Sequence, residues 1–184
     1  MAQRMLSNKE RFRMLQILSY DETWISLFKA EAEALKLLFA ENLIAIHHIG
    51  STSIPGLAAK PIIDIMAIVK EIGVVDSLEE LLSAQDYQGL GEYGIPGRRF
   101  FRKGGQDRRY HLHVFQQDNP EIKRHLTFRD FMRQHPQLVK EYSQLKQQTA
   151  EDAPYDLQGY SSMKDQFIDR INKMAIQEIE NKES

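Results

Sequence analysis

The stretch HHIGSTSIPGLAAKPIIDIMAIV, residues 47–69, decides the fold of this chain. It predicts a strand over 43–49, a loop of small residues over 50–59 and a second strand over 61–69. Nearly every position of the second strand is apolar, as in strands that are buried on both faces. Asp64 interrupts that run, and a buried carboxylate is costly unless it is paired, hydrogen-bonded or bound to a metal. Asp64 is therefore the most informative single residue in the sequence.

The loop between the two strands has the composition of an anion-binding turn. Gly50 lets the backbone approach a ligand closely, and the residues after it supply hydroxyl and backbone N–H groups. A short helix starting here would direct its N-terminus at the same point, which favours a phosphate. The alternative is an ordinary tight turn in which Asp64 hydrogen-bonds the loop backbone. The candidate phosphate- or nucleotide-binding residues of this region are His48, Gly50, Ser51, Thr52, Ser53 and Lys60.

Helical and strand patterns on both sides of this stretch predict an α+β (mixed α/β) fold, with a small mixed central sheet flanked by helices and a helical C-terminal third. The expected elements are helices over 21–39, 77–85 and 161–181, helices beginning near Thr127 and Pro136, and strands over 98–103 and 108–115. Asp21 and the capping-box spacings at Ser77 and Thr127 mark three of the helix starts. The inward faces are expected to carry Trp24, Leu27, Phe28, Leu35 and Leu38 in the first helix and Ile168, Ile171, Ala175 and Ile179 in the last.

Composition sets the class of protein. The chain has 184 residues, 42% hydrophobic and 27% charged, which suits one globular domain. We expect an N-terminal extension over 1–19 and one domain over 20–184. The net charge of -2 gives no global electrostatic case for binding nucleic acid or a membrane, so any anion site must be local.

Two further compositional features bear on compartment and chemistry. The chain has no cysteine, which excludes disulfides, cysteine-based zinc sites and thiol catalysis. The first residues carry charge where a secretion signal would need an apolar run, and the longest apolar stretch, 62–69, is too short to cross a bilayer. We therefore expect a cytoplasmic protein. Nothing in the sequence fixes its oligomeric state.

His111 and His113 form a second candidate site. Alternate residues of a strand share a face, so both imidazoles point the same way. With Asp64 they could complete a two-histidine, one-carboxylate metal site, or one of them could act as a general base. The alternative is that both form hydrogen bonds in a polar pocket or face solvent.

A third group is basic and aromatic. Arg98, Arg99, Arg102, Lys103, Arg108 and Arg109 surround Phe100 and Phe101. Guanidinium groups suit phosphate, and Arg99 and Arg102 are the candidates for a ligand's phosphates. The alternative is a solvated hairpin of alternating charge. Farther along, Arg129 could reach the site, Asp130 is expected to cap a helix start, and Lys146 is expected to be a packing or surface residue.

The spacing around Asp64 resembles that of the DNA polymerase beta-type nucleotidyltransferase superfamily. Ile49-Gly50-Ser51 matches its apolar residue followed by Gly-Ser, and twelve residues separate Ser51 from Asp64. In that superfamily the Gly-Ser segment holds nucleotide phosphates, and two carboxylates on the following strand hold divalent metal ions. The sequence departs at the second acidic position, which is Met66. Asp64 alone does not supply the carboxylates that a two-metal site needs.

A closer resemblance, to the GrpB family, runs from Tyr20 to the last helix. GrpB proteins are a bacterial group placed as a divergent branch of the nucleotidyltransferase fold, and some members look fused to a dephospho-coenzyme A kinase domain. The matching segments are YDETW (20–24), HIGSTSIPGLAAKPIIDI (48–65), IPGRRFFRK (95–103), HLHVF (111–115), HLTFRDFMRQHP (125–136) and YSQLK (142–146).

The sequence leaves three functional hypotheses. The first is nucleotidyl transfer, with the phosphates on the Gly-Ser loop and Mg²⁺ or Mn²⁺ held by Asp64 with His111 or His113. The second is a non-catalytic module that binds a nucleotide or a coenzyme A-like ligand, which Met66 favours. The third is a metal-dependent hydrolase that uses His111, His113 and Asp64. The number of acidic groups near Asp64 discriminates among them, and Glu92, Asp107 and Asp118 are the candidates.

Overall fold

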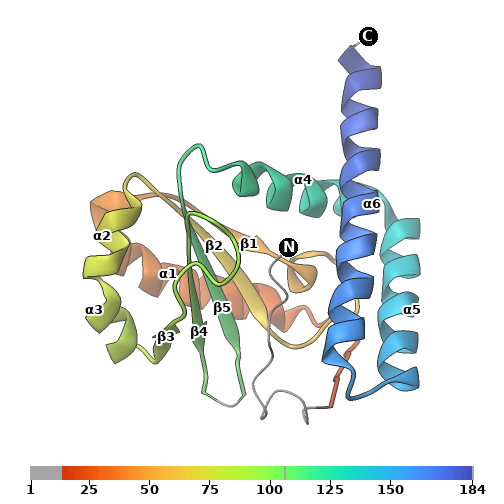
Figure 1. Cartoon of the computed structure of the whole chain (residues 1–184), viewed down its shortest axis with the longest axis horizontal. Helices are drawn as coiled ribbons and strands as arrows, with labels where there is room; N and C mark the ends of the chain where they lie inside the picture. Colours follow the sequence, from red (N-terminus) through yellow and green to blue (C-terminus); the bar gives the residue numbers. More distant parts are fainter. Residues whose placement is uncertain (1–13, 106, 184) are drawn as a thin grey trace.

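The computed structural model describes residues 14–105 and 107–183, and it shows a mixed five-stranded sheet flanked by helices (Figure 1). The strands are β1 (Leu43–Ile49), β2 (Ile63–Val69), β3 (Tyr87–Gly89), β4 (Arg98–Lys103) and β5 (Tyr110–Gln116). The helices are α1 (Thr23–Phe39), α2 (Ile72–Ser77), α3 (Glu79–Ala84), α4 (Pro120–Gln134), α5 (Pro136–Asp152) and α6 (Leu157–Glu183), with 3-10 turns η2 (Ala40–Asn42) and η3 (Ser51–Ser53). The predicted fold class is confirmed.

The sheet brings three distant parts of the sequence into register. Its strand order is β1-β2-β5-β4-β3, and only the central pair, β2 with β5, is parallel. Asp64 lies opposite Ile49 on one side and His111 on the other. Residues in direct register point to the same face of a sheet, so Asp64 shares its face with both predicted histidines.

Each face of the sheet packs against a different set of helices. On one face, Leu35 and Phe39 of α1 pack with Ile65 and Leu112, in a core that also includes Val75 and Leu82 of the two short helices. On the other face, Met66 and Phe115 pack with Ile122 and Leu126 of α4. Because both faces are covered, the central strand β2 is almost entirely buried, as its apolar run predicted.

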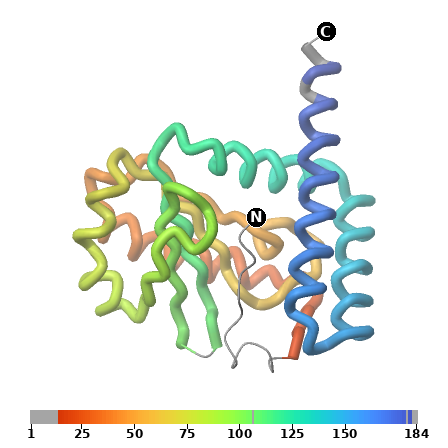
Figure 2. Tube along the Cα trace, in the orientation of Figure 1, coloured from red at the N-terminus to blue at the C-terminus, as the bar shows by residue number. Residues whose placement is uncertain are grey.

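The helical third forms its own core and holds the loop that follows β1. Met132 of α4, Tyr142 of α5 and Ile171 of α6 pack together, and Ile54 and Leu57 of the loop insert among them. The loop after Gly50 is thus held between the sheet and the helices. Beyond this core, α6 continues past the rest of the molecule as a single straight helix (Figures 1 and 2).

Several local expectations are corrected. The helix expected near Thr127 begins at Pro120, because Asn119 accepts a hydrogen bond from the Glu121 N–H and the proline suits the first turn. Ser77 ends α2 instead of capping the next helix, and its hydroxyl bonds the carbonyl of Val74. Leu27, expected inside, is 45% exposed, whereas Phe39 is buried. Neither α2 nor the short strand β3 was among the elements expected from the sequence.

The described part of the segment before Tyr20 contacts the domain. Leu15 is buried with Ala150 and Tyr160, and Leu18 pairs with Ala59 in an isolated bridge. The rest of the expected extension, residues 1–13, lies outside the described residues, as does the side chain of Ile179.

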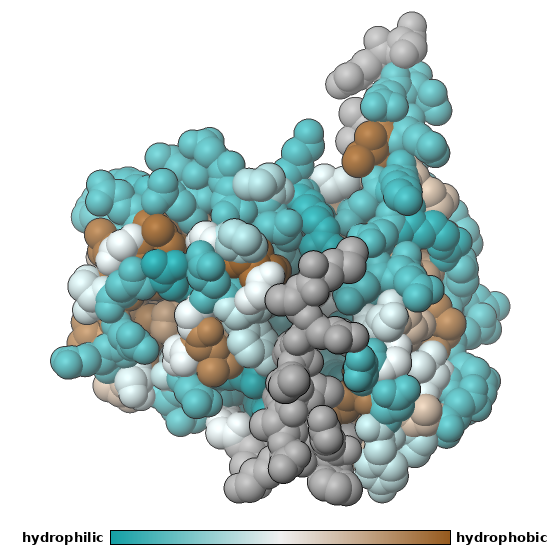
Figure 3. Space-filling model, viewed as in Figure 1, coloured by the Kyte–Doolittle hydropathy of each residue, from teal (hydrophilic) through white to brown (hydrophobic). Residues whose placement is uncertain are grey.

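The exterior offers little apolar surface on the face shown in Figure 3, where hydrophobic residues form small separate patches in a hydrophilic surround. Within residues 14–105 and 107–183, no helix combines the length and the apolar character needed to cross a membrane.

Candidate functional site

Asp64 lies at the centre of a cluster formed by β2 and β5. Its Oδ1 is 3.2 Å from Nδ1 of His111 and 3.5 Å from Nε2 of His113, and its side chain is 26% exposed. Burial raises the pKa of Asp64, but the interactions with His111 and His113 outweigh burial and hold the pKa well below its usual range. The structure therefore brings the three predicted catalytic or metal-binding residues together around an ionised carboxylate.

The two histidines differ in their surroundings. Burial lowers the pKa of His113, so its ring is neutral at pH 7. His125 of α4 packs against His113 with ring centroids 5.7 Å apart, and burial lowers the pKa of His125 to about 3. The side chain of Phe100 contacts both His111 and His113 at its edge. The cluster is therefore enclosed on two sides by neutral aromatic rings.

Gly50 passes directly over the carboxylate. Its φ is +69°, a left-handed conformation that favours glycine, and a Cβ at this position would lie 2.9 Å from Cβ and Cγ of Asp64. The nearest carboxylate oxygen to that point is Oδ2. Gly50 was expected to approach a ligand, and the atoms that it approaches in the structure are those of Asp64.

The hydroxyls after Gly50 have different roles. Thr52 is buried and donates to the carbonyl of Ile62 at 3.2 Å, so its oxygen accepts from Nε2 of His48 at 3.0 Å. Ser53, also buried, donates to the carbonyl of Gly50 at 2.7 Å. Both hydroxyls, which we expected on a ligand's phosphate, thus hold the loop in shape. The 3-10 turn they form has three residues, too few for a helix dipole to attract an anion.

These roles predict losses of stability of different size for substitutions at two neighbouring residues. Thr52→Val should lower the free energy of unfolding by about 1–2 kcal/mol, because two buried hydrogen bonds are lost. Ser51→Ala should lower it by about 1 kcal/mol, since Ser51 is only half-buried and loses one hydrogen bond, from Nζ of Lys146. Urea unfolding of both variants tests the assignment. A larger loss for Ser51→Ala would contradict it.

Ser51 faces a buried lysine from the helical third. Nζ of Lys146 donates to Oγ of Ser51 at 3.1 Å and lies 4.4 Å from the ring centre of Tyr142. The residue is 1% exposed. In the described part of the chain no carboxylate forms an ion pair with it, and burial, aided by the charge of Lys164, lowers the pKa of Lys146 to about 6.

Lys146 was expected to be a packing or surface residue; it is buried, and its contact with Ser51 was not expected. The sequence did contain a signal. Lys146 follows Tyr142 by one helical turn and Leu138 by two, which places it on the inward stripe of α5.

Two other lysines lie near the same loop. Nζ of Lys60 is 4.5 Å from the ring centre of Tyr160, and Nζ of Lys164 is 5.9 Å from it. Lys60, predicted as a phosphate ligand, thus lies against α6. Together Lys60, Lys146 and Lys164 form a group of amines, here called the lysine cluster, on the α5–α6 side of the loop.

Arginines of α4 fix the loop from its other side. Arg133 donates twice to the carbonyl of Ser53, at 3.0 and 2.6 Å, and Arg129 donates to the carbonyl of His48 at 3.2 Å. Arg129 thus reaches the loop, as anticipated. Asp130 accepts from the guanidinium of Arg129 in the middle of the helix, so its expected role as a helix cap is wrong.

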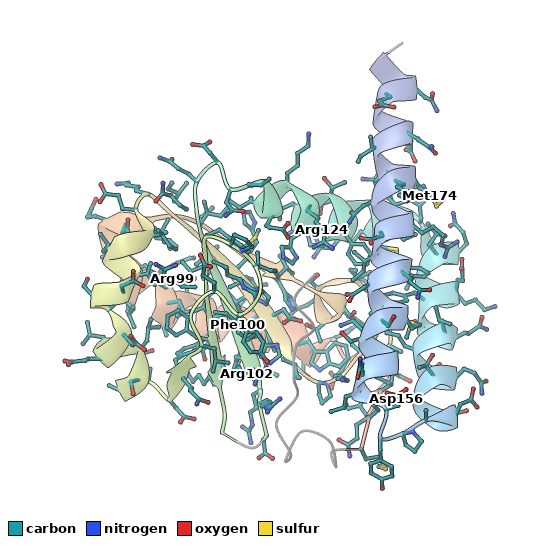
Figure 4. All side chains as sticks on the ribbon, viewed as in Figure 1. Arg99, Phe100, Arg102, Arg124, Asp156 and Met174 are labelled. Atoms are coloured by element: carbon teal, nitrogen blue, oxygen red, sulfur yellow. The ribbon has the colours of Figure 1, made fainter. Side chains whose placement is uncertain are left out.

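The arginines of β4 divide between the two faces of the sheet by their alternation along the strand, and in Figure 4 Arg99 lies nearer α2 than Arg102 does. Arg102 lies opposite His111 on the face of Asp64, and it donates to the hydroxyl of Tyr93. Arg99 points to the other face, where its fork binds Asp76 of α2, with one contact at 2.9 Å. His48 also faces away from Asp64, stacks on Phe28, and has a pKa lowered to about 4 by burial. The structure therefore does not bring Arg99 or the His48 ring to the carboxylate.

The acidic residues proposed as companions of Asp64 lie elsewhere. Glu92 accepts from the backbone of Gly97, and Asp118 lines a groove of about 710 Å³ between α4 and α6. Met66, at the second acidic position of the superfamily, is fully buried. Among the residues that the structure describes, no three histidine, aspartate or glutamate side chains are grouped as metal ligands. The donor set therefore does not fit a two-metal centre.

Known proteins share this architecture. The family model described as GrpB protein matches residues 14–174. UPF0157 protein YqkA of Bacillus subtilis (strain 168) is 49% identical over 163 residues, which cover 89% of this chain and 48% of the relative. The chain thus spans about half the length of that relative.

Solved structures agree with the sequence match. The crystal structure of conserved protein GrpB from Enterococcus faecalis is 44% identical, covers 89% of this chain and 99% of that chain, and has a TM-score of 0.85. Cid1 in complex with its short product ApU has a TM-score of 0.51 at 12% identity, over 72% of this chain and 42% of that chain. The second likeness shows a shared fold and concerns the fold alone. By its family match and its near relatives, the chain belongs to the GrpB family.

Proposed function

We propose that this protein binds a phosphate-bearing ligand of the nucleotide class between the Gly-Ser loop and α5. The observation that carries the proposal is Lys146, a buried lysine beside Ser51 with no ion pair in the described structure. A buried ammonium group without a counter-ion is costly. A phosphate at Ser51 Oγ would supply that counter-ion, and the rest of the lysine cluster would add to the positive field.

The fold supports the nucleotide class. Cid1, whose sheet and helices resemble those of this chain, is described in complex with its short product ApU. In this chain the Gly50-Ser51 step lies between Asp64 on one side and Lys146 on the other. A ligand with several phosphates has the charge to interact with both sides.

The site formed by Asp64 and the Gly-Ser loop fits one divalent cation, whereas it does not fit two. Mg²⁺ is commonly bound through one or two carboxylates together with the phosphates of a ligand. Asp64 is ionised and presents Oδ2 toward the Gly50 backbone. Mg²⁺ or Mn²⁺ at this oxygen would offset the repulsion between Asp64 and a phosphate. The module would then bind nucleotide without the second carboxylate that Met66 replaces.

A second candidate is nucleotidyl transfer itself. The ionised Asp64 beside the Gly-Ser loop favours it, whereas Met66 in place of the usual second carboxylate counts against it. In such a reaction an acceptor hydroxyl forms a bond to the α-phosphorus of a nucleoside triphosphate, and pyrophosphate leaves. Arg99 takes no part, since it is paired with Asp76 on the other face.

Isothermal titration of the full chain tests the proposal. We expect ATP, CTP or coenzyme A to bind more tightly with Mg²⁺ or Mn²⁺ present. Asp64→Asn should remove that metal dependence, whereas Lys140→Met, at an exposed position of the same helix as Lys146, should bind as the wild type does. Failure of all three ligands to bind under every metal condition would overturn the proposal. Release of pyrophosphate that is lost in Asp64→Asn would select the transferase candidate.

A further inference from the structure

Arg98 is a buried arginine whose guanidinium contacts an imidazole of the Asp64 cluster. It is 5% exposed and packs over Phe100, with 4.7 Å between the guanidinium carbon and the ring centre. Its Nε donates to the carbonyl of Glu92 at 3.2 Å, and one terminal nitrogen donates to the carbonyl of Tyr93 at 2.7 Å. The other terminal nitrogen lies 3.2 Å from Nδ1 of His113.

The contact with His113 has only one chemically sensible direction. A guanidinium carries N–H donors and has no acceptor. Nδ1 of His113 must therefore present its lone pair to Arg98, and in the neutral ring the proton is then on Nε2. A proton on Nδ1 would place two donors against each other inside the protein, which buried polar groups avoid.

Asp64 determines which ring nitrogen of His111 carries the proton, and the result differs from that for His113. Nδ1 of His111 is 3.2 Å from Oδ1 of the carboxylate, and an ionised carboxylate only accepts. The proton of His111 is therefore on Nδ1. Nε2 of His113 lies 3.5 Å from the same oxygen but makes no hydrogen bond within the described residues, so its N–H faces the carboxylate without a close acceptor.

We infer that Arg98 is a positioning residue that fixes His113 as the Nε2–H tautomer, so that His113 turns an N–H toward Asp64 and does not act as a metal ligand. Nδ1 of His113 is then occupied by Arg98, and Nε2 carries the proton that faces Oδ1 of Asp64 at 3.5 Å. The lone pair of His111 is on Nε2, which makes no hydrogen bond within the described residues. Oδ2 of Asp64 and this lone pair are the groups left to bind a cation. This last step rests on the proposed function, whereas the tautomers do not.

The arrangement gives Arg98 a role distinct from that of its neighbours on β4. Arg99 lies on the other face with Asp76, and Arg102 is opposite His111 with Tyr93. Arg98 was part of the basic cluster identified in the sequence, where it was not distinguished from the other arginines. Its position two residues before Phe100, which pairs with His113, places it diagonally across the strand from that imidazole.

Nuclear magnetic resonance of the full chain with ¹⁵N-labelled histidine tests the inference without a ligand. We expect His113 in the Nε2–H form and His111 in the Nδ1–H form, each as a single tautomer. Arg98→Met should convert His113 to a mixture of tautomers, while Arg99→Met, which removes the adjacent arginine from the other face, should leave the ring signals unchanged. Wild-type His113 protonated at Nδ1 would overturn the inference even if Arg98→Met failed to fold.

Metal addition supplies a second, independent test. Mg²⁺, and Zn²⁺ as a stronger imidazole ligand, should leave the proton of His113 on Nε2. Loss of that proton with coordination shifts on both rings would show a two-histidine metal site and overturn the inference. Absence of nucleotide binding would defeat the proposed function alone, since the tautomers are measured in the free protein.

Discussion

Lys146→Met should make the protein more stable while removing most of its affinity for phosphate. Burial lowers the pKa of Lys146 from 10.5 to about 6, so the folded state at pH 7 disfavours the charged form that the unfolded chain prefers. One unit of pKa shift corresponds to about 1.4 kcal/mol. At pH 7 about 3.5 pH units of that difference apply, so replacing the amine by an apolar side chain of similar length should raise the free energy of unfolding by up to about 5 kcal/mol.

The pH dependence distinguishes this cause from better packing. Between pH 6 and 10.5 the unfolded chain binds a proton at Lys146 that the folded protein does not, so wild-type stability rises with pH across that range. The advantage of Lys146→Met should be greatest near pH 6 and disappear above about pH 10.5. Urea titrations at several pH values measure it, with Lys140→Met as the exposed control. An advantage that does not change with pH would contradict the assignment.

Ligand binding should also change the protonation of Lys146. A phosphate beside Lys146 favours the ammonium form, so binding at pH 7 to 8 should take up a proton and should weaken as the pH rises. Calorimetric titrations in buffers of different ionisation enthalpy count that proton. In Lys146→Met the uptake should vanish, and affinity should fall by at least about tenfold, or 1.4 kcal/mol. Unchanged affinity would show that the ligand does not contact this lysine.

Gly50→Ala should strongly lower the free energy of unfolding, although it adds only one methyl group to the loop. The added Cβ would lie 2.9 Å from Cβ and Cγ of Asp64, and the φ of +69° disfavours any side chain. A left-handed conformation alone costs about 1–2 kcal/mol, and overlap with a packed neighbour adds about 1–3 kcal/mol. We expect a total loss of about 3 kcal/mol in the free energy of unfolding.

Gly91 provides a matched control. Its φ is +60°, yet a Cβ there would meet nothing within 4 Å. Gly91→Ala should therefore cost only the backbone term, about 1–2 kcal/mol. In a double-mutant cycle, Asp64→Ala should recover part of the loss caused by Gly50→Ala, because the overlapping carboxylate is removed. Equal losses for the two glycines would show that the backbone near Gly50 moves away from Asp64 at little cost.

The sequence predicted the central sheet well because the information there is local. The apolar run of β2 identified a buried strand, Asp64 stood out within it, and alternation placed His111 and His113 on one face. The same alternation separates Arg99 from Arg102, which are three positions apart, so treating both as ligands of one phosphate overlooked an available signal.

Other features depended on partners that are distant in sequence. Thr52 and Ser53 resemble phosphate-binding residues in composition, and only the fold shows that their hydroxyls bond Ile62 and Gly50. The role of Arg98 follows from the register of β4 with β5, which sequence spacing alone does not set. The capping-box spacing at Thr127 does not start a helix, because Asn119 and Pro120 start α4 earlier in the chain.

The two halves of the proposed site are made at different times during synthesis. The Asp64–His111 hydrogen bond joins residues 47 positions apart, and the Ser51–Lys146 bond joins residues 95 positions apart. Contacts of such separation form slowly, because loop closure must precede them. A growing chain that has emerged as far as β5 can assemble Asp64 and its histidines but still lacks the lysine. Affinity for phosphate should therefore arise only once α5 has left the ribosome and docked, which would make ligand binding a signal that the late part of the chain has folded onto the early part.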